Sequence, residues 1–342
     1  MRRLFYTSTL LVAGALVFAP TVTNAQAAAP AGLSNTTTAP SSATPTWPIK
    51  PIRFVVPFGA GSFTDLAART VGSELSAKLG QPIIVETKGG AGSTLGTDLV
   101  AKAANDGYTF LVTDNSFAVS AALYSKLPYA PKDLMQVSLL ADAPAVLVGR
   151  PGLAANTLKE TVELARNNPG KLSFGSGGQG SSAQLAMEAF LLQNKLELIH
   201  VPFKGIAPAL MEVAADRVDI AISSVGTASA YLKDNRLKGL AISSEKRHPN
   251  MPNVPTFAEA GFPSYKMMYW FGVMAPAGTP AAIIERLQKE ITKAVASQKV
   301  IEVFSTTGVR AIATSSATFT KMVQSETTLW SEVITRAKIK LE

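Results

Sequence analysis

Residues 52–79 have the sequence IRFVVPFGAGSFTDLAARTVGSELSAKL, which predicts a buried strand, a glycine-rich loop and a helix in immediate succession. The run 52–57 is almost entirely apolar and rich in β-branched residues, as buried strands are. Within 64–79, Val71, Leu75 and Leu79 recur four residues apart, which places them on one face of a helix. A strand that leads directly into an amphipathic helix begins a βαβ unit, so this stretch indicates an α/β fold.

The same alternation of strand and helix recurs along the chain. We expect further strands at 83–86, 108–113, 172–175, 196–202 and 218–223, and helices between them at 95–104, 183–193 and 207–215. Such a succession predicts mainly parallel sheets that are flanked by helices.

Two longer apolar stretches, 139–149 and 269–275, indicate that the chain crosses between two sheets. If it leaves one domain near residue 148 and returns near 271, residues 47–147 and 271–342 form lobe 1, and residues 148–270 form lobe 2. The C-terminal helices expected at 280–297 and 315–337 then rejoin lobe 1. The predicted fold class is therefore α/β, with two lobes joined by two crossing strands and a ligand cleft between them.

The N-terminal residues 1–25 are typical of an export signal, because Arg2 and Arg3 precede the apolar run 10–19 and a small-residue cleavage motif follows at 25–27. Residues 26–46 form a charge-free tract of Ala, Pro, Ser and Thr, which indicates a low-complexity linker. The alternative interpretation, that residues 10–19 form a short buried helix, agrees less well with the low-complexity tract that follows at 26–46. We expect a periplasmic protein whose signal peptide is cleaved.

Composition excludes several classes of protein. The 342 residues are 47% hydrophobic and 16% charged, which excludes a disordered chain and suits about two domains. The longest apolar run is ten residues, whereas a membrane-spanning helix needs about 20. The sequence has no cysteine, and its two histidines, His200 and His248, lack metal-ligand spacing, so we expect no metal and no cofactor. The net charge of +8 is scattered, which argues against nucleic acid as a partner.

Three loops of small residues, at 59–65, 89–93 and 175–182, each follow a predicted strand and precede a predicted helix. Backbone N–H groups at a helix N-terminus carry roughly half a positive charge, so they can hold a carboxylate or a phosphate without lysine or arginine. An anion is therefore the expected ligand. The alternative is that these glycines serve only the geometry of tight turns.

The third loop also matches the pattern G-x-G-x-x-G through Gly175, Gly177 and Gly180. Dinucleotide-binding proteins place an acidic residue about 20 positions later, at the end of the second strand. Glu197 comes too early in its strand for this role, and the sequence has no phosphate-binding P-loop and no G-x-S-x-G motif. We therefore do not expect a nucleotide cofactor.

Taken in order, these motifs resemble the Bug (TctC-like) extracytoplasmic solute receptors of tripartite tricarboxylate transporters. The resemblance runs from Trp47 to the C-terminal helices and includes VPF at 56–58, GSFTD at 61–65, GGAG at 89–92, GSGGQG at 175–180 and HVPFKG at 200–205. It implies a periplasmic-binding-protein fold that closes over a small organic acid, without catalysis. It also implies integral-membrane permease subunits as partners, to which the acid is delivered.

Matching positions in the family hold one carboxylate of the ligand. They correspond here to Phe58, Gly59, Ala60, Ser62, Thr64 and Asp65 in lobe 1, and to Ser176, Gly178, Ser181 and Ser182 in lobe 2. Asp65 has the alternative role of a helix-capping acid.

The chain departs from the family pattern in the first of these loops and near the third. Gly59 and Ala60 replace two prolines, Ser62 replaces a glycine, Phe63 replaces a small residue, and Phe203 replaces a tyrosine. Rings near the pocket favour an aromatic carboxylate such as terephthalate over citrate or an amino acid. The alternative is that at least two of the rings of Phe58, Phe63 and Phe203 belong to the core.

Two other functions stay open from the residues. The chain could be a sensor subunit with the same fold, whose closed, ligand-bound form is recognised by a signalling partner. It could also be a periplasmic hydrolase with Ser176 or Ser181 as nucleophile and His200 as base, although the sequence offers no nucleophile elbow and no third group to orient the histidine.

Overall fold

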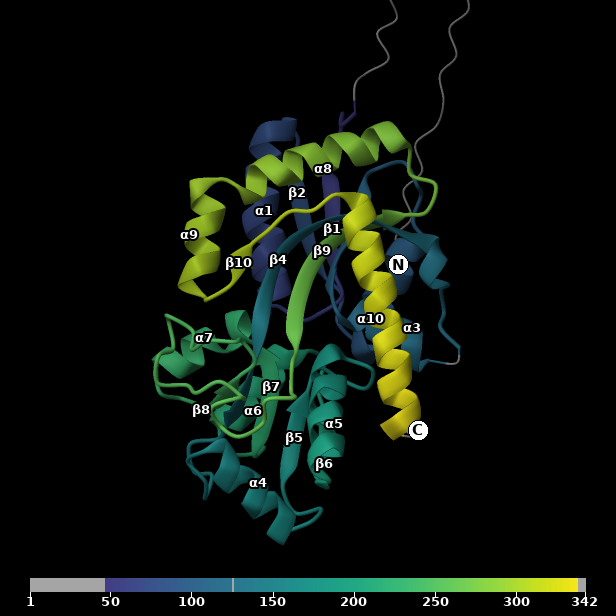
Figure 1. The fold of residues 1–342 in the computed structure, drawn as a ribbon. Helices are drawn as coiled ribbons and strands as arrows, with labels where there is room; N and C mark the ends of the chain where they lie inside the picture. The colour runs from purple at the N-terminus through teal and green to yellow at the C-terminus, as the bar shows by residue number, and fades with distance from the viewer. Residues whose placement is uncertain (1–46, 125, 338–342) are drawn as a thin grey trace, which may run out of the picture. The chain divides into compact units, whose positions relative to one another are not determined.

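The strand and helix predicted within residues 52–79 are β1 (Ile52–Val56) and α1 (Phe63–Leu79). A computed structural model describes residues 47–124 and 126–337 of the protein (Figure 1). The predicted export signal and linker therefore lie outside the described residues. Helix α1 begins after Ser62, whose Oγ accepts from Asp65 N, and ends at Gly80, which adopts a left-handed conformation with φ of 69°.

The strands form one hydrogen-bonded path in the order β2-β1-β3-β9-β4-β7-β5-β6, with β8 and β10 each paired to β4. Their bounds are β2 (Ile83–Thr87), β3 (Thr109–Asp114), β4 (Leu134–Gly149), β5 (Ser173–Ser176), β6 (Ile199–Pro202), β7 (Ile220–Ser224), β8 (Lys238–Ile242), β9 (Met268–Pro276) and β10 (Arg310–Ala311). Strand β1 is parallel to β2 and β3, and β5 is parallel to β6 and β7, whereas β9 is antiparallel to β3 and β4. The predicted α/β fold class is confirmed, but the expectation of mainly parallel sheets is wrong. Five of the nine pairings between the described strands are antiparallel, because β4 and β9 are antiparallel to every strand with which they pair.

Strand β4 is the element that connects two parts of this path. Its residues 134–144 pair with β9, and its residues 145–149 pair with β7. We call β2, β1, β3, β9, β10 and the first part of β4 the first half-sheet. The last part of β4 with β7, β5, β6 and β8 is the second half-sheet. Strands β4 and β9 run side by side (Figure 1). The division of the chain into two lobes, with limits between residues 147 and 148 and between residues 270 and 271, stays a prediction.

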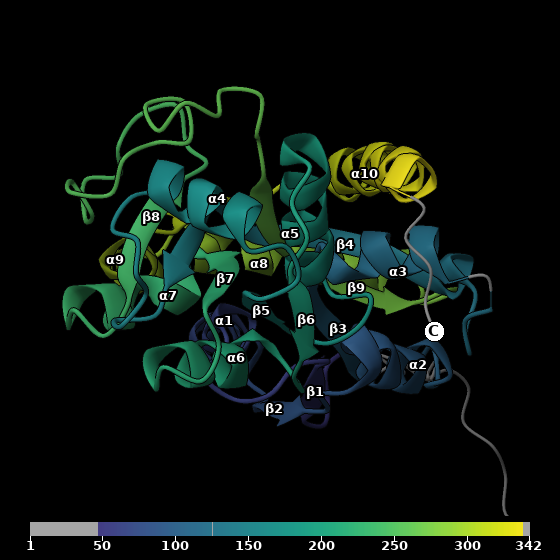
Figure 2. The ribbon, with the colours of Figure 1, turned by 90° about the horizontal axis from the view of Figure 1, so that it is seen from below.

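Helices pack against both half-sheets. Their bounds are α2 (Thr94–Ala101), α3 (Ser116–Leu123), α4 (Leu158–Asn167), α5 (Ser182–Asn194), α6 (Ile206–Ala214), α7 (Val225–Lys233), α8 (Ala281–Val295), α9 (Gln298–Thr306) and α10 (Ser316–Ala337). Helix α8 contacts α1 and β4, and α6 contacts β5 and β7. Helix α10 contacts α3, β4 and α5, and it lies beside α5 in Figures 1 and 2 although the two are far apart in the sequence.

The predicted element bounds agree with the structure within about five residues, and three of them need correction. The crossing strand predicted from 139 begins at Leu134. The helix predicted to reach residue 104 ends at Ala101, and the strand predicted from 196 begins at Ile199. The last correction has a local cause: Lys195 ends α5 in a left-handed conformation, with φ of 53°, so the chain needs three more residues to enter the sheet.

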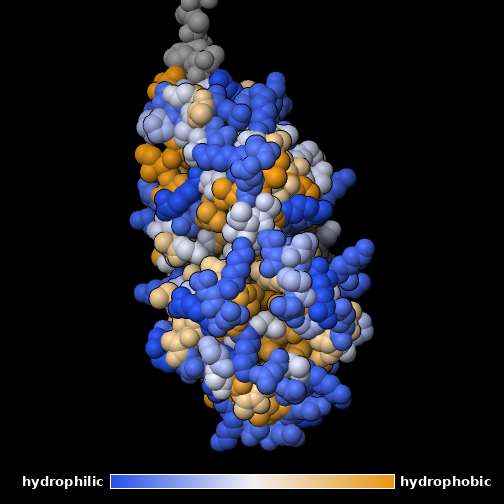
Figure 3. Space-filling view, turned by 90° about the vertical axis from the view of Figure 1, so that its left-hand side faces the viewer, coloured by the Kyte–Doolittle hydropathy of each residue, from blue (hydrophilic) through white to orange (hydrophobic). Residues whose placement is uncertain are grey.

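Polar side chains cover most of the face drawn in Figure 3, and the apolar ones form separate patches among them. None of the helices in the described part of the chain is both long enough and apolar enough to cross a membrane.

Candidate functional site

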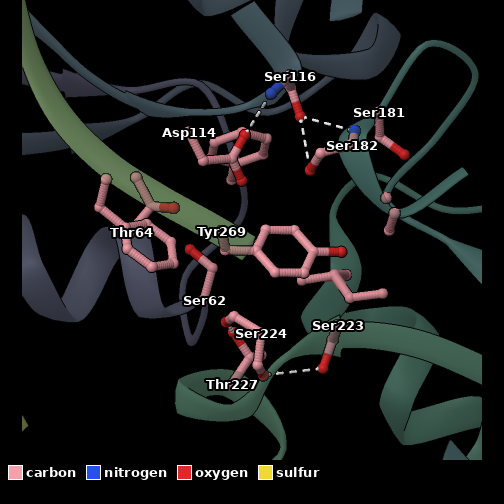
Figure 4. Close-up of a pocket in the computed structure, with 15 residues that line it drawn as sticks. Ser62, Thr64, Asp114, Ser116, Ser181, Ser182, Ser223, Ser224, Thr227 and Tyr269 are labelled. Atoms are coloured by element: carbon pink, nitrogen blue, oxygen red, sulfur yellow. Dashed lines mark hydrogen bonds between the residues drawn. The ribbon is translucent and has the colours of Figure 1, made fainter. Parts of the chain in front are cut away.

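A pocket lies where β1, β3, β5 and β7 end and the loops and helices that follow them begin (Figure 4). In open α/β sheets, this edge beyond the carboxyl ends of parallel strands is where ligands bind. Both half-sheets and their helices contribute to the lining, which consists of Phe58, Ser62, Thr64, Asp114, Ser116, Gly177, Ser181, Ser182, Ala183, Ile206, Ser223, Ser224, Thr227, Tyr269 and Phe271.

The lining is rich in neutral hydrogen-bonding groups. Nine of the fifteen side chains carry a hydroxyl, one carries a carboxyl, and none of these described residues is a lysine, arginine or histidine. The cavity volume is about 20 Å³, which is room for about one water molecule. A larger solute therefore requires the walls of the pocket to move apart before it enters.

Hydrogen bonds between helix N-termini hold the two walls together. The backbone N–H of Phe63, in α1, donates to Thr227 Oγ1, in α7, at 3.1 Å. The N–H of Ser182, in α5, donates to Ser116 Oγ, in α3, at 3.0 Å. Within the ranges that the structure describes, the N–H groups of Thr64 and Ala183 have no hydrogen-bond acceptor. These two groups, which come from opposite walls, are among the donors that remain available to an anion in the pocket.

Of the twelve residues predicted for the site, five line this pocket: Phe58, Ser62, Thr64, Ser181 and Ser182. Two of these serines also begin helices. Ser62 Oγ accepts from Asp65 N, and Ser181 Oγ accepts from Gln184 N. The serines that the sequence placed at helix N-termini thus do cap α1 and α5.

Three other predicted residues lie away from the pocket lining for reasons of packing. Phe63 is buried in the core, with its ring centroid 4.6 Å from that of Phe271 and 5.1 Å from that of Phe304. Asp65 accepts from Gly61 N and forms an ion pair with Arg69, as a capping acid does. Phe203 is partly buried against the core.

Gly59, Gly178 and the neighbouring Gly92 allow the loops of the two half-sheets to approach each other. A Cβ on Gly59 would lie 3.3 Å from Lys204 O, and one on Gly178 would lie 3.4 Å from Gly92 N of the first half-sheet as well as 3.0 Å from Phe203 O of its own half-sheet. A Cβ on Gly92 would lie only 2.0 Å from Gln179 O. These glycines serve close contact between loops, a role that differs from both the anion-binding role and the tight-turn role considered from the sequence. Ala60 is exposed and is absent from the pocket lining.

Ser176 and His200, the pair considered for hydrolysis, do lie together. Ser176 Oγ is 2.6 Å from His200 Nε2, and the histidine ring stacks on Phe174 with centroids 4.8 Å apart. Ser176 is fully buried, is absent from the pocket lining, and also accepts from Gly178 N. No described carboxylate contacts His200, so the arrangement fixes the loop after β5 instead of presenting a nucleophile to the pocket.

Burial lowers the pKa of His200 to about 4, which predicts an acid-sensitive fold. Because the unfolded histidine titrates near its ordinary 6.5, neutral His200 stabilises the folded state above pH 6.5, and this stability is lost as the pH falls toward 4. We expect wild type to lose roughly 2–3 kcal/mol more than His200→Gln between pH 7 and pH 4. Urea unfolding at both pH values measures this; equal losses in the two proteins would contradict the prediction.

Ten lining residues were not predicted for the site from the sequence. Asp114 ends β3 and Ser116 comes two residues later, Ser223 and Ser224 end β7, and the others are Gly177, Ala183, Ile206, Thr227, Tyr269 and Phe271. The first four share a signal that was available: small polar residues at the end of a buried strand, as in the loops that were identified.

Asp114 is the one carboxyl group of the lining. Its Oδ1 accepts from Ser116 N at 2.8 Å. Burial raises its pKa to about 6, and the nearby carboxylate of Glu326 contributes to the same direction. Asp114 is thus charged at neutral pH in a pocket that otherwise contains hydroxyls, helix N-termini and apolar groups.

Known proteins resemble this chain along most of its length. The family model described as tripartite tricarboxylate transporter family receptor matches residues 67–339. The UPF0065 protein in the tcbD-tcbE intergenic region of Pseudomonas sp. (strain P51) is 37% identical over 86% of this chain and 88% of its own length. The solved periplasmic binding protein BugD is similar with a TM-score of 0.83 and 29% identity, covering 86% of this chain and 100% of BugD. MatC from Rhodopseudomonas palustris, solved with bound malate, is similar with a TM-score of 0.81 and 30% identity, covering 84% of this chain and 100% of MatC.

Proposed function

The chain belongs to the tripartite tricarboxylate transporter receptor family, and from this premise we propose that it is a periplasmic binding protein that captures a small carboxylic acid and delivers it to membrane permease subunits. The family resemblance and the periplasmic-binding-protein fold predicted from the sequence are confirmed by these comparisons. The family is one of solute receptors, which supports a role in binding without turnover.

The observation that carries the carboxylate proposal is the convergence of helix N-termini on a pocket without cationic side chains. The N–H groups of Thr64, in α1, and Ala183, in α5, come from opposite walls and lack acceptors among the described residues. A carboxylate between them would receive charge-assisted hydrogen bonds from both half-sheets. MatC, which was solved with malate, supports a carboxylic acid as the class of ligand.

We further propose an aromatic carboxylate, such as terephthalate. The rings that support it are those of Phe58, Tyr269 and Phe271, which line the pocket. An aromatic ligand would pack against them, and each ring pair contributes about 0.5–1.5 kcal/mol beyond the burial of area. Only one of these, Phe58, is among the three rings on which the sequence based this ligand class.

A binding screen tests the proposal. We expect benzoate, the phthalate isomers, adipate, citrate or glutamate to include at least one acid that raises the thermal midpoint and gives a calorimetric isotherm. An acid present at 100 times its Kd stabilises the folded state by about 2.7 kcal/mol. Ser181→Ala should weaken that binding, with Ser305→Ala, in the exposed end of α9, as the matched control.

Two outcomes would contradict the proposed function. The first is that no carboxylic acid in the screen shifts the midpoint or binds by calorimetry. The second is recovery of a chemically altered acid after incubation with the protein, which would indicate an enzyme.

A further inference from the structure

Asp114 and Tyr269 both present unused hydrogen-bonding capacity to the same pocket. Tyr269, on β9, is 3% exposed, and its hydroxyl is completely buried without a hydrogen-bond partner in the described part of the chain. Asp114, at the end of β3, is 8% exposed. Its Oδ1 accepts from Ser116 N, and the Ser116 side chain also interacts with the carboxylate, which has about four acceptor sites and so keeps capacity for a further donor. Figure 4 shows both side chains among the hydroxyl groups of the lining.

Such groups are costly to leave unsatisfied, so they indicate what a bound solute supplies. A buried hydroxyl without a partner has lost its hydrogen bonds to water, and this loss is compensated when a ligand provides the missing partner. Tyr269 can donate, and a carboxylate oxygen accepts. Asp114 Oδ2 can only accept while it is ionised, so the solute must bring a donor to it.

We propose that the pocket selects carboxylic acids that also carry a neutral O–H group, whose hydrogen is donated to Asp114 while the carboxylate accepts from Tyr269. This inference rests on the proposed function, because it specifies the class of acid that the same pocket takes. With rings in the lining, a hydroxybenzoate is the type of solute that fits both requirements.

The charges around Asp114 favour an O–H over a second carboxylate. Glu326, on α10, raises the pKa of Asp114, and Tyr269 faces it as a neutral group. Glu326 is itself half-buried and accepts from Asn115 and from the indole N–H of Trp330. No described cation contacts Asp114, so an ionised second carboxylate would meet uncompensated negative charge.

Two kinds of solute can supply the O–H, and pH separates them. A hydroxyl is neutral throughout the physiological range. The second carboxyl of terephthalate supplies an O–H only after it takes up a proton. Binding of terephthalate is then linked to proton uptake, so its affinity should fall about tenfold per pH unit above the Asp114 pKa of about 6.

The experiment is calorimetry with benzoate, 4-hydroxybenzoate, 3-hydroxybenzoate and terephthalate at pH 5.5, 6.5 and 7.5. We expect at least one hydroxybenzoate to bind about 10–100-fold more tightly than benzoate at pH 7.5, the ratio expected for a hydrogen bond to a charged group. Asp114→Asn keeps an oxygen for Ser116 N but removes the charge. It should reduce this ratio about tenfold and remove the pH dependence of terephthalate binding.

Two further variants separate specific from general effects. Tyr269→Phe should weaken benzoate and the hydroxybenzoates by similar factors, leaving their ratio unchanged, because it removes only the donor to the carboxylate. Asp106→Asn, at an exposed site in an ion pair with Lys50, controls for the loss of one negative charge and should leave all affinities unchanged.

The results distinguish the two proposals. If benzoate and both hydroxybenzoates bind within twofold of one another, or if Asp114→Asn leaves the ratio unchanged, the O–H requirement is wrong while the receptor function stands. If none of the four acids nor any acid of the earlier screen binds, the proposed function fails, and this inference fails with it.

Discussion

Gly92→Ala is expected to weaken binding of the acids identified by the screen by at least about tenfold. The methyl group would lie 2.0 Å from Gln179 O, a backbone atom that cannot rotate away. The loop at 89–93 follows β2 of the first half-sheet, and Gln179 follows β5 of the second. The added methyl must therefore push the two loops apart, and the closed form loses stability relative to an open one.

This loss appears as affinity because only the closed pocket brings donors from both walls to the solute. If closure becomes 1.4 kcal/mol less favourable, the apparent Kd rises about tenfold. Calorimetry measures the affinity. Small-angle scattering with saturating acid should show that the variant stays more expanded than wild type.

Gly170→Ala is the matched control for this experiment. Gly170 has φ of +66°, close to the +60° of Gly92, but a Cβ there would have no atom within 4 Å. Both variants carry the backbone strain of alanine in the left-handed region, and only one of them separates the loops. Equal effects of the two substitutions on affinity would show that strain, and not closure, is responsible.

Phe63→Ala is expected to destabilise the folded state by about 3–5 kcal/mol, the cost of deleting a ring from a packed core. Phe63 is 1% exposed and lies against the rings of Phe271 and Phe304. It therefore joins α1 to β9 and α9, and its loss leaves a cavity among three elements. Urea unfolding of the signal-free protein measures the change.

Leucine variants show whether the same ring also serves binding. Phe63→Leu should retain the affinity of wild type for the acids of the screen, because Phe63 is absent from the pocket lining. Phe58→Leu should lower the affinity, because the Phe58 ring lines the pocket. The reverse pattern would place Phe63 in the binding site.

The first strand and helix were predictable because all of their signals are local. The apolar run of β1, the cap provided by Ser62 and the four-residue spacing in α1 lie within thirty residues of one another. Helix α3 was missed for the opposite reason. Its first five residues, Ser116 to Ser120, are all buried, so it has little of the polar face that produces a helical period.

The direction of the aromatic rings could not be predicted, because it depends on distant partners. Phe58 and Phe63 are five residues apart and both belong to the first loop region. Phe271 and Phe304, which hold Phe63 in the core, are more than 200 residues away in the sequence. The close approach of Gly92 to Gln179 could not be predicted for the same reason, because the sequence of one loop does not identify the loop that it contacts.

The pocket meets the carboxylate of its solute with dipoles instead of cationic side chains, and this has a consequence for the medium in which the protein works. Dissolved ions screen charges over about 10 Å at 0.1 M salt, which weakens solvent-exposed ion pairs. The N–H groups of Thr64 and Ala183 and the hydroxyl of Tyr269 act at contact distance inside a closed pocket, from which those ions are excluded. A receptor built in this way would hold its acid almost equally well in dilute and in saline water.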